Sequence, residues 1–425
     1  MSKPFQTLRL QLLRQIYHWE MASAELANLE QSASPQAWAS LERYVGVSLR
    51  QSLSEAVNQL QREARIVRAM YEVARYPNDL DAVWRQLIAY RDRYLKTETL
   101  VDFYGHAVNT RTNSTLSTNL RALDVLAMRS MQQLLEPLGK QTPPVLTYLD
   151  RGLGASILKA GLRLWDGTLS PVATIKVTYH NRRRPTSLIH ETGHQVAHIL
   201  DWNMELAAVL AQGLNDQRSE LGQVWSSWAS EVAADCFGFV HTGFAAVAAL
   251  SDVVVGEPSM VFRYTPGDPH PVSYIRVLLG VEMCRRFYGR GPWDELGEAW
   301  IERYPTKLAP TFTRELLEAS QAALQKIVEL CLLRRMRAFG NKALADLIDP
   351  LRVSPQSLER LEMEAGRALF TSSRWVWSEC VRLIGLTGLK FVTRPEESQI
   401  TAKLQDQLMT RLGESVSSIY TPATA

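Results

Sequence analysis

The chain has 425 residues, enough for two or three domains that each bury a core. Its composition is typical of a globular protein, with 46% hydrophobic and 21% charged residues. A net charge of +3 is too small to indicate nucleic-acid binding, and the one dense basic run, Arg182-Arg183-Arg184, is typical of a solvated turn. These values indicate a soluble globular protein that binds no nucleic acid.

No segment is predicted to direct the chain into or across a membrane. Residues 1–20 alternate leucine with polar residues and lack the apolar core of a signal peptide. The most apolar stretch, residues 237–256, is interrupted by His241, Ser251 and Asp252, which favours a buried helix over a membrane span. The four cysteines are far apart and form no C-x-x-C pair, which suits a reducing compartment. We therefore expect a cytoplasmic protein, with export that needs no signal peptide still open.

Residues 1–141 are predicted to form a helical region. Apolar residues recur there three and four positions apart, as at Leu49, Leu53, Ala56 and Leu60. This region contains no motif that carries chemistry. The run Thr142-Pro143-Pro144 marks its end.

Strands are predicted after this boundary. Residues 145–149 form one candidate strand, and residues 162–165 and 173–179 are predicted to form a hairpin around Asp166-Gly167. The second arm of this hairpin is β-branched and alternating. Its free edge could pair with an extended peptide, whose main chain would then cross the metal site predicted next. The alternative is an ordinary sheet edge.

The sequence His190-Glu191-Thr192-Gly193-His194 matches H-E-x-x-H, the pattern of zinc peptidases. On a helix, positions i and i+4 lie on one face, so both imidazoles can reach one ion. Glu191 is rotated about 100° from His190, close enough to hold a water beside that ion. Residues 188–200 contain few helix breakers, which predicts a helix here. The pattern by itself also occurs by chance in unrelated proteins.

A catalytic zinc ion requires a third protein ligand. The extended pattern H-E-x-x-H-x-x-G-x-x-H is absent, because Ala197 and Leu200 replace its glycine and its last histidine. Asp201 lies one residue beyond that position and is an alternative ligand. His198 is rotated toward the Glu191 side of the helix, so we predict that it is packed or exposed to solvent.

A better third ligand lies downstream, in Ser230-Glu231-Val232-Ala233-Ala234-Asp235. Glu231 and Asp235 are four residues apart and project from one face of a predicted helix. Glu231 could bind the metal while Asp235 accepts the second N–H of a ligand histidine and so fixes its tautomer. The alternative is a solvated acidic pair, but the apolar neighbours Trp228 and Phe237 indicate a buried helix, where carboxylates need partners.

Together with His270-Pro271-x-x-x-x-Arg276, these motifs resemble the gluzincin peptidases. The likeness is greatest to the M48 family, which includes the CAAX prenyl endopeptidases and the HtpX-type bacterial proteases. It extends over residues 173–286, with the three motifs in the family's order. The familiar members contain long apolar membrane helices that this chain lacks, which argues against membrane substrates and CAAX processing.

The resemblance implies a role for each motif residue. His190, His194 and Glu231 would be the zinc ligands, Glu191 the general base, and Asp235 the partner of a ligand histidine.

It also implies that His270 and Arg276 lie near the substrate or support the site. His270, between two prolines, is the leading candidate for a donor to the oxyanion. Arg276 could instead pair with a buried carboxylate near the metal.

We therefore expect an α+β, mainly helical protein. Residues 142–305 would form a zincin-like metallopeptidase core with a small mixed sheet and an active-site helix, flanked by helical regions at 1–141 and 306–425. The expected function is that of a zinc-dependent endopeptidase acting on peptide or protein substrates. One alternative is a delivered protease effector or toxin whose helical regions bind a protein partner. Another is a non-catalytic zinc-binding structural protein, but the presence of Glu191 argues against it.

Overall fold

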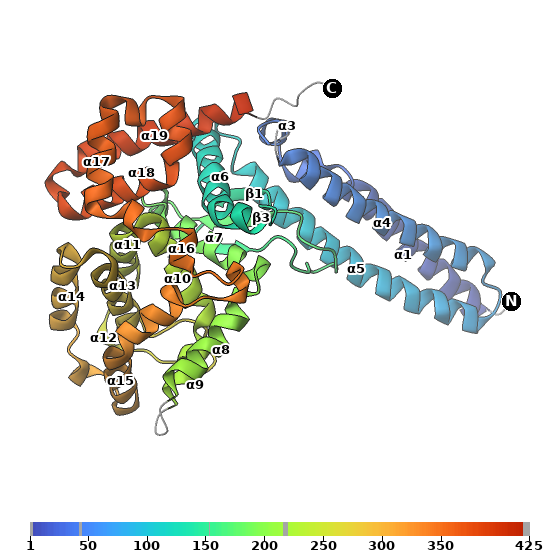
Figure 1. Ribbon diagram of the computed structural model, residues 1–425. Coiled ribbons are helices and arrows are strands. Elements are labelled where there is room, and N and C mark those ends of the chain that lie inside the picture. The colour runs from blue at the N-terminus through green and yellow to red at the C-terminus, as the bar shows by residue number, and fades with distance from the viewer. Residues whose placement is uncertain (1–2, 42–44, 153, 216–219, 420–425) are drawn as a thin grey trace. The chain divides into compact units, whose positions relative to one another are not determined.

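The chain forms two compact units in the computed structural model (Figure 1). The first unit consists of the chain up to Ser117 together with Ala160–Ala173, and the second of Thr118–Lys159 and Thr174–Ile419. The structure describes residues 3–41, 45–152, 154–215 and 220–419.

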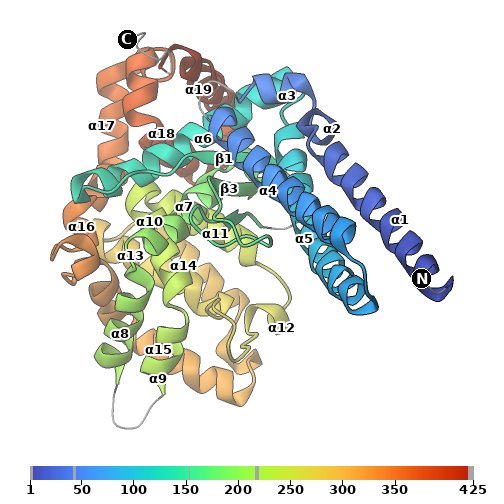
Figure 2. The ribbon, with the colours of Figure 1, turned by 90° about the vertical axis from the view of Figure 1, so that its right-hand side faces the viewer.

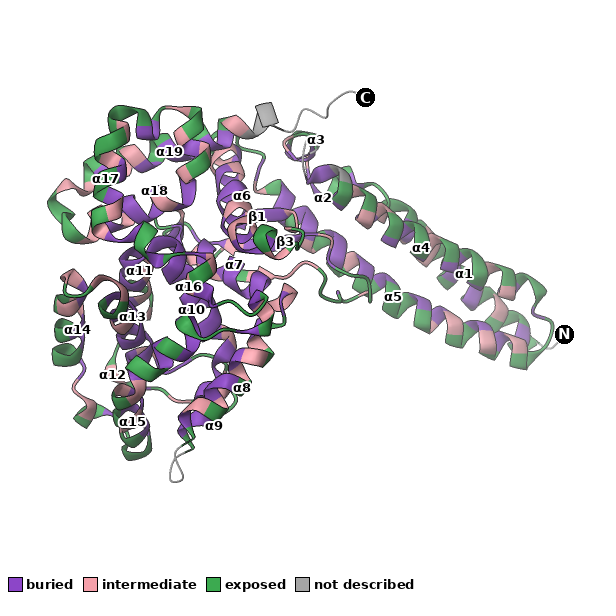
Figure 3. Cartoon of the chain, viewed as in Figure 1, coloured by how far each residue is buried: buried purple, intermediate pink, exposed green. Residues whose placement is uncertain are grey.

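Long helices dominate the first unit. Helices α1 (Lys3–Leu26), α4 (Gly46–Val73) and α5 (Pro77–Asn109) lie side by side (Figures 1 and 2), and the short helices α2 (Leu29–Ser32) and α3 (Pro35–Ala39) connect α1 to α4. Their apolar faces meet in one core, while the opposite faces are exposed (Figure 3). Buried residues of this core include Leu12, Ile16, Leu60, Val67, Leu80 and Leu87. The helical pattern predicted for this part of the chain is confirmed.

The second unit contains a small mixed sheet with strand order β1-β3-β2. Its strands are β1 (Val145–Leu149), β2 (Ser156–Leu158) and β3 (Ala173–Val177). Strands β2 and β3 are antiparallel, with Ile157 opposite Ile175. Because β3 is central, its three β-branched side chains are all buried.

Two predictions about the strands are wrong. Residues 162–165 do not pair with residues 173–179, because the Asp166-Gly167 turn closes only an isolated bridge between Arg163 and Leu169. Four of the five residues of β3 are buried, and the strand gains more burial between two neighbours than it would in a two-stranded hairpin. The second wrong prediction is the free edge of this strand, since β1 and β2 occupy both edges of β3. Among the described strands, β2 has an outer edge with no partner strand.

Helices make up most of the second unit. Three of them carry the residues of the candidate site, namely α7 (Thr186–Ile199), α10 (Ala229–Thr242) and α13 (Ser273–Tyr288). Figure 3 shows α7 and α10 as largely buried. Helix α6 (Ser114–Leu135) begins at the end of the first unit and continues into the second. The remaining described α-helices are α8 (Trp202–Leu214), α9 (Leu221–Ser227), α11 (Phe244–Val254), α12 (Pro258–Val261), α14 (Pro292–Arg303), α15 (Thr311–Val328), α16 (Leu344–Leu347), α17 (Pro355–Ala365), α18 (Ser373–Thr393) and α19 (Ser398–Ile419).

The predicted fold class is confirmed, since the protein is 76% helical with a three-stranded sheet. The two units nevertheless divide the chain differently from the three predicted regions 1–141, 142–305 and 306–425. Helix α15 packs on α13, and α18 packs on α10 and α11, so the C-terminal helices belong to the same unit as the sheet. Composition alone does not reveal such packing, because core helices and flanking helices have the same amphipathic pattern.

Among the described residues, no helix combines the length and the apolar composition needed to cross a bilayer. The four cysteines are buried and unpaired.

His241 is an ionisable residue buried in α10. Its ring packs against Phe237, with 4.4 Å between ring centroids, and its Nε2 has no hydrogen-bond partner among the described residues. Burial, helped by the charge of Arg352, lowers the pKa of His241 from 6.5 to about 3. The ring is therefore neutral at physiological pH.

We expect the protein to lose stability as the pH falls below 6.5. The unfolded chain then binds a proton at His241 that the folded chain does not bind. This residue should lower the free energy of unfolding by about 2 kcal/mol at pH 5 and about 4 kcal/mol near pH 3, relative to pH 8. Urea unfolding at several pH values measures the slope. His241→Asn keeps an N–H near the Ser130 carbonyl but does not titrate, so an unchanged slope in this variant would contradict the assignment.

Candidate metal centre

Helix α7 brings His190 and His194 to one face, as the sequence predicts. Leu188, Ile189 and Val196 are buried and hold the helix against the core. The predicted helix at residues 188–200 is confirmed, and α7 begins slightly earlier, at Thr186. The two imidazoles have 4.9 Å between their ring centroids and are nearly perpendicular, at 88°.

Glu231 comes to these histidines from the first turn of α10. The helix that the sequence predicts around Glu231 and Asp235 is confirmed as α10, and a break at Trp228 separates it from α9. The break makes Glu231 an N-terminal residue of α10, where the helix dipole favours a negative charge. Its Oε1 lies 3.2 Å from Nε2 of His194, and its Oε2 lies 3.4 Å from Nε2 of His190.

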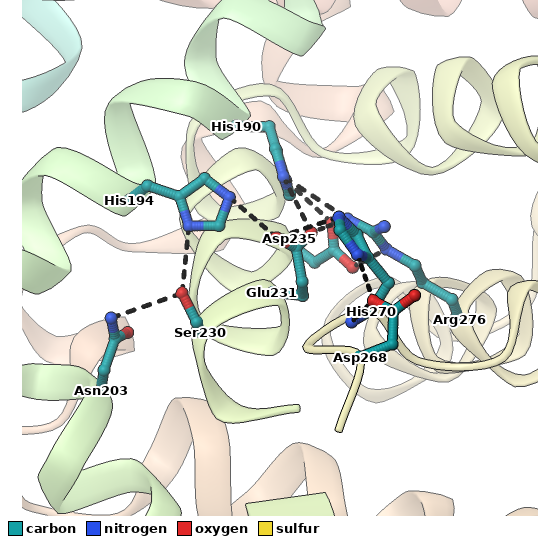
Figure 4. Close-up of polar contacts among 9 residues, drawn as sticks. All are labelled: His190, His194, Asn203, Ser230, Glu231, Asp235, Asp268, His270 and Arg276. Carbon is teal, nitrogen blue, oxygen red and sulfur yellow. Dashed lines mark hydrogen bonds and ion pairs between the residues drawn. The ribbon is translucent and has the colours of Figure 1, made fainter. Parts of the chain in front are cut away.

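His190, His194 and Glu231 form a group that could hold a metal ion, with one ligand atom from each within 4.8 Å of the others (Figure 4). Two imidazole nitrogens and a carboxylate oxygen are a donor set that suits zinc and other first-row divalent metals. The residues present therefore fit the metal that the sequence predicts.

A close contact between α7 and α10 brings the ligands together. A Cβ atom added to Gly193 would lie 2.9 Å from Cα of Ala234 and 3.0 Å from Cβ of Phe237. A larger residue at position 193 would force the two helices apart and carry Glu231 away from the histidines. The glycine between Glu191 and His194 is thus part of the site's construction, a role that the H-E-x-x-H pattern does not reveal.

Asp235 and Arg276 contact the ligands and hold them in place (Figure 4). Oδ1 of Asp235 lies 3.0 Å from Nδ1 of His190, which leaves Nε2 of that ring directed toward Glu231. Arg276, on α13, donates to Asp235 from Nε at 2.6 Å and from Nη2 at 2.8 Å, and Nη2 also donates to Glu231 at 3.0 Å. Arg276 therefore pairs with buried carboxylates, the second of the two roles considered for it.

These contacts shift the pKa values of Asp235, Glu231 and His190. Burial raises the pKa values of Asp235 and Glu231, but Arg276 and the His190 hydrogen bonds outweigh burial and hold both below their usual range. Burial lowers the pKa of His190, yet its hydrogen bonds to Asp235 and Glu231 raise it to about 9. In the metal-free protein these hydrogen bonds thus favour the protonated His190 ring, and a metal ion would displace that proton.

Arg276→Ala is expected to lower the free energy of unfolding by about 3–5 kcal/mol, because it leaves Asp235 and Glu231 buried without their countercharge. Urea unfolding of the metal-free protein measures this loss. Arg285→Ala on the same helix is the matched control, since Arg285 is 45% exposed in its pair with Asp294. That exposed pair should be worth less than about 1 kcal/mol. Equal losses in the two variants would show that Arg276 does not have the predicted role.

His270 lies at the edge of the group. Its Nδ1 is 2.6 Å from Oδ1 of Asp268, and its Nε2 is 3.6 Å from Oε1 of Glu231. Its side chain is 59% exposed, so these carboxylates hold it and packing does not. The hydrogen bonds from the His270 backbone and ring hold the pKa of Asp268 below its usual range.

Glu191 is buried on α7, with 8% of its surface exposed. Burial raises its pKa, and the neighbouring histidines offset this only in part. A carboxyl group with a raised pKa is suited to accept a proton and hold it briefly.

His194 has an outer partner that the sequence motifs do not predict. Its Nδ1 lies 3.3 Å from Oγ of Ser230, and Asn203 of α8 donates to the same Oγ at 3.4 Å. Ser230 immediately precedes Glu231, which is the only signal of its role in the sequence. Asn203 has no such signal, because its position depends on how α8 packs.

The alternative third ligand is not part of the group. Asp201 is exposed, with a left-handed backbone (φ 53°) before α8, and the metal-binding group found among the described residues does not include it. His198 is partly buried and lies outside the cleft beside the group, in agreement with its prediction as a packed or solvent histidine.

The group lines a cleft of about 810 Å³. Glu191, His190, His194 and Glu231 form its polar part. Strand β2 contributes Ser156 and Ile157, and α11 contributes apolar residues that include Val247 and Leu250. A chain with an apolar side chain could therefore lie beside the candidate metal ligands.

The fold and the site define an α+β protein with a candidate metal centre of two histidines and one glutamate. In comparisons with known proteins, the chain matches no family, no characterised protein and no solved structure.

Proposed function

We propose that this protein is a zinc-dependent endopeptidase. The observation that carries the proposal is that His190, His194 and Glu231 converge beside Glu191 on the wall of one cleft. Catalytic zinc sites use three protein ligands and keep a fourth position for reacting groups, whereas structural sites are closed by four. A structural site would need neither Glu191 nor an adjoining cleft.

The chemistry follows from the positions of these groups. When bound, zinc polarises the scissile carbonyl and lowers the pKa of a water toward about 7. Glu191 takes the proton of the attacking water and passes it to the leaving amine. Asp235 keeps the His190 ring oriented, and Arg276 balances the charge of Asp235 and Glu231.

His270 is the proposed donor to the oxyanion. Its Nδ1–H donates to Asp268, which fixes the ring beside the cleft. Its Nε2 faces the metal-binding group, so that an N–H there would donate to the developing negative charge.

His270→Ala should lower kcat by about 100-fold or more, because one donor to an oxyanion is worth about 3 kcal/mol. KM should change little, since the interaction forms mainly in the transition state. Steady-state kinetics on a peptide substrate measures both constants. A variant with wild-type kcat would remove His270 from the mechanism and leave the donor unidentified.

The motifs also support a place among the gluzincin peptidases, with a likeness to the M48 family. In this structure the H-E-x-x-H residues, Glu231 with Asp235, and His270 with Arg276 meet at one site, as members of that class would require. Their convergence from three segments supports the proposal more strongly than the five-residue pattern alone.

Identification of cleaved peptide bonds tests the proposed function. Zinc-loaded protein is incubated with a denatured protein mixture, and new N-termini are identified by labelling and mass spectrometry. We expect a set of internal cleavages that is absent with Glu191→Gln protein. If both proteins yield the same termini, the proteolysis comes from a contaminant and the proposal fails.

A further inference from the structure

Lys159 is a cation in the cleft whose role the proposed mechanism does not explain. It directly follows the edge strand β2 and lines the cleft with Ile157 from that strand. It is partly buried. Burial lowers the pKa of Lys159, and the charges of Glu231 and Glu191 offset this only in part. The ammonium group therefore senses the same two carboxylates that serve the proposed chemistry.

The other strong cations of the cleft already have partners. Arg276 is paired with Asp235 and Glu231, and Arg184 is paired with Asp252. Lys159, by contrast, makes no hydrogen bond or ion pair with any residue in the described part of the chain. A partly buried charge without a close partner carries a desolvation cost that a bound anion would offset.

The edge strand explains where such an anion would lie. The outer edge of β2 has no partner among the described strands. An extended peptide added to this edge would run along β2 toward Lys159 and past the metal-binding group, since Ile157, Lys159 and Glu191 line one cleft.

We infer that the cleft selects peptides carrying a carboxylate close to the scissile bond, and that Lys159 binds this carboxylate. The inference rests on the proposed peptidase function. The carboxylate comes either from an aspartate or glutamate side chain or from the C-terminus of the peptide. Both sources present the same charge to the ammonium group.

Matched peptide libraries test the inference on the zinc-loaded, full-length protein. The libraries are randomised except at one position, which holds glutamate in the first and glutamine in the second, and this position is moved along the peptide. A further pair compares a free with an amidated C-terminus. The variants are Lys159→Met, which keeps the length of the side chain without its charge, and Lys159→Glu, which reverses the charge. Lys140→Met, at an exposed lysine outside the cleft, is the control.

We expect the wild type to cleave one carboxylate library with a kcat/KM about 10- to 100-fold higher than its neutral partner. Lys159→Met should abolish this preference, Lys159→Glu should reverse it in favour of the neutral library, and Lys140→Met should match the wild type. A preference confined to glutamate over glutamine identifies a side-chain carboxylate, and one confined to the free C-terminus identifies the α-carboxylate.

Two results would overturn the inference. Lys159→Met could lower cleavage of all libraries equally, which would make Lys159 a countercharge to Glu191 or a donor to the oxyanion. Lys159→Met could also leave the preference for the carboxylate libraries unchanged.

Binding of the labelled libraries to Glu191→Gln protein, measured by fluorescence anisotropy, separates this inference from the proposed function. If the wild type cleaves no library, the peptidase proposal fails. The anisotropy then tests Lys159 alone, by comparing Glu191→Gln with Glu191→Gln/Lys159→Met. If the double variant no longer binds the carboxylate library more tightly than the neutral one, Lys159 binds the carboxylate. If its Kd for the carboxylate library is unchanged, the inference is contradicted.

Discussion

Glu191→Gln is expected to lower the rate of peptide cleavage by about 100- to 10,000-fold, which is the usual contribution of a general base. Glutamine has nearly the same shape as glutamate but cannot accept the proton of the attacking water. Because Glu191 is not one of the three proposed ligands, zinc content and thermal stability should remain close to those of the wild type. Cleavage rates, zinc content and melting curves measured on the same preparations test each part of this result.

Glu191→Asp is a useful companion variant. It keeps the carboxylate but shortens the side chain by one methylene, so it should retain more activity than Glu191→Gln while remaining impaired. Comparable cleavage by Glu191→Gln and the wild type would exclude the role of general base. Loss of zinc from Glu191→Gln would instead mean that Glu191 helps to hold the metal.

The second large effect is expected from removal of a metal ligand, which should weaken zinc binding and with it peptide cleavage. We expect His190→Ala, His194→Ala and Glu231→Ala each to weaken zinc binding by more than about 100-fold, since even the outer partners of zinc ligands contribute about 10- to 100-fold. Zinc content after dialysis, and competition with a fluorescent chelator, measure the affinity. Cleavage should fall in parallel with zinc content.

Asp201→Ala is the control for the third ligand, because Asp201 is exposed and lies outside the metal-binding group. It should bind one zinc ion as the wild type does. Full zinc affinity and activity in Glu231→Ala would contradict the ligand assignment and return Asp201 to consideration.

The sequence predicts the local part of the site well. His190, Glu191 and His194 lie within five residues of one helix, whose geometry alone fixes their relative positions. Glu231 and Asp235 are predictable as a pair for the same reason. That the pair faces the histidines depends on the close packing of α7 on α10, which Gly193 permits.

Other features depend on contacts between distant segments, for which the sequence carries no periodic signal. Strand β3 has the right residues for a strand, but its central position follows from pairing on both sides and not from its own sequence. Asn203 and Lys159 likewise reach the site through the packing of α8 and the course of β2. The broad class, an α+β and mainly helical protein, is predictable because helical periodicity extends through most of the chain.

Diffraction from crystals of the zinc-loaded protein, recorded at the zinc absorption edge, tests the central claim most directly. We expect one anomalous peak, within bonding distance of His190 Nε2, His194 Nε2 and a Glu231 carboxylate oxygen, with the fourth side free of protein atoms and facing Glu191. A peak at another place, or a zinc ion enclosed by four protein side chains with His270 as the fourth, would contradict a catalytic zinc centre.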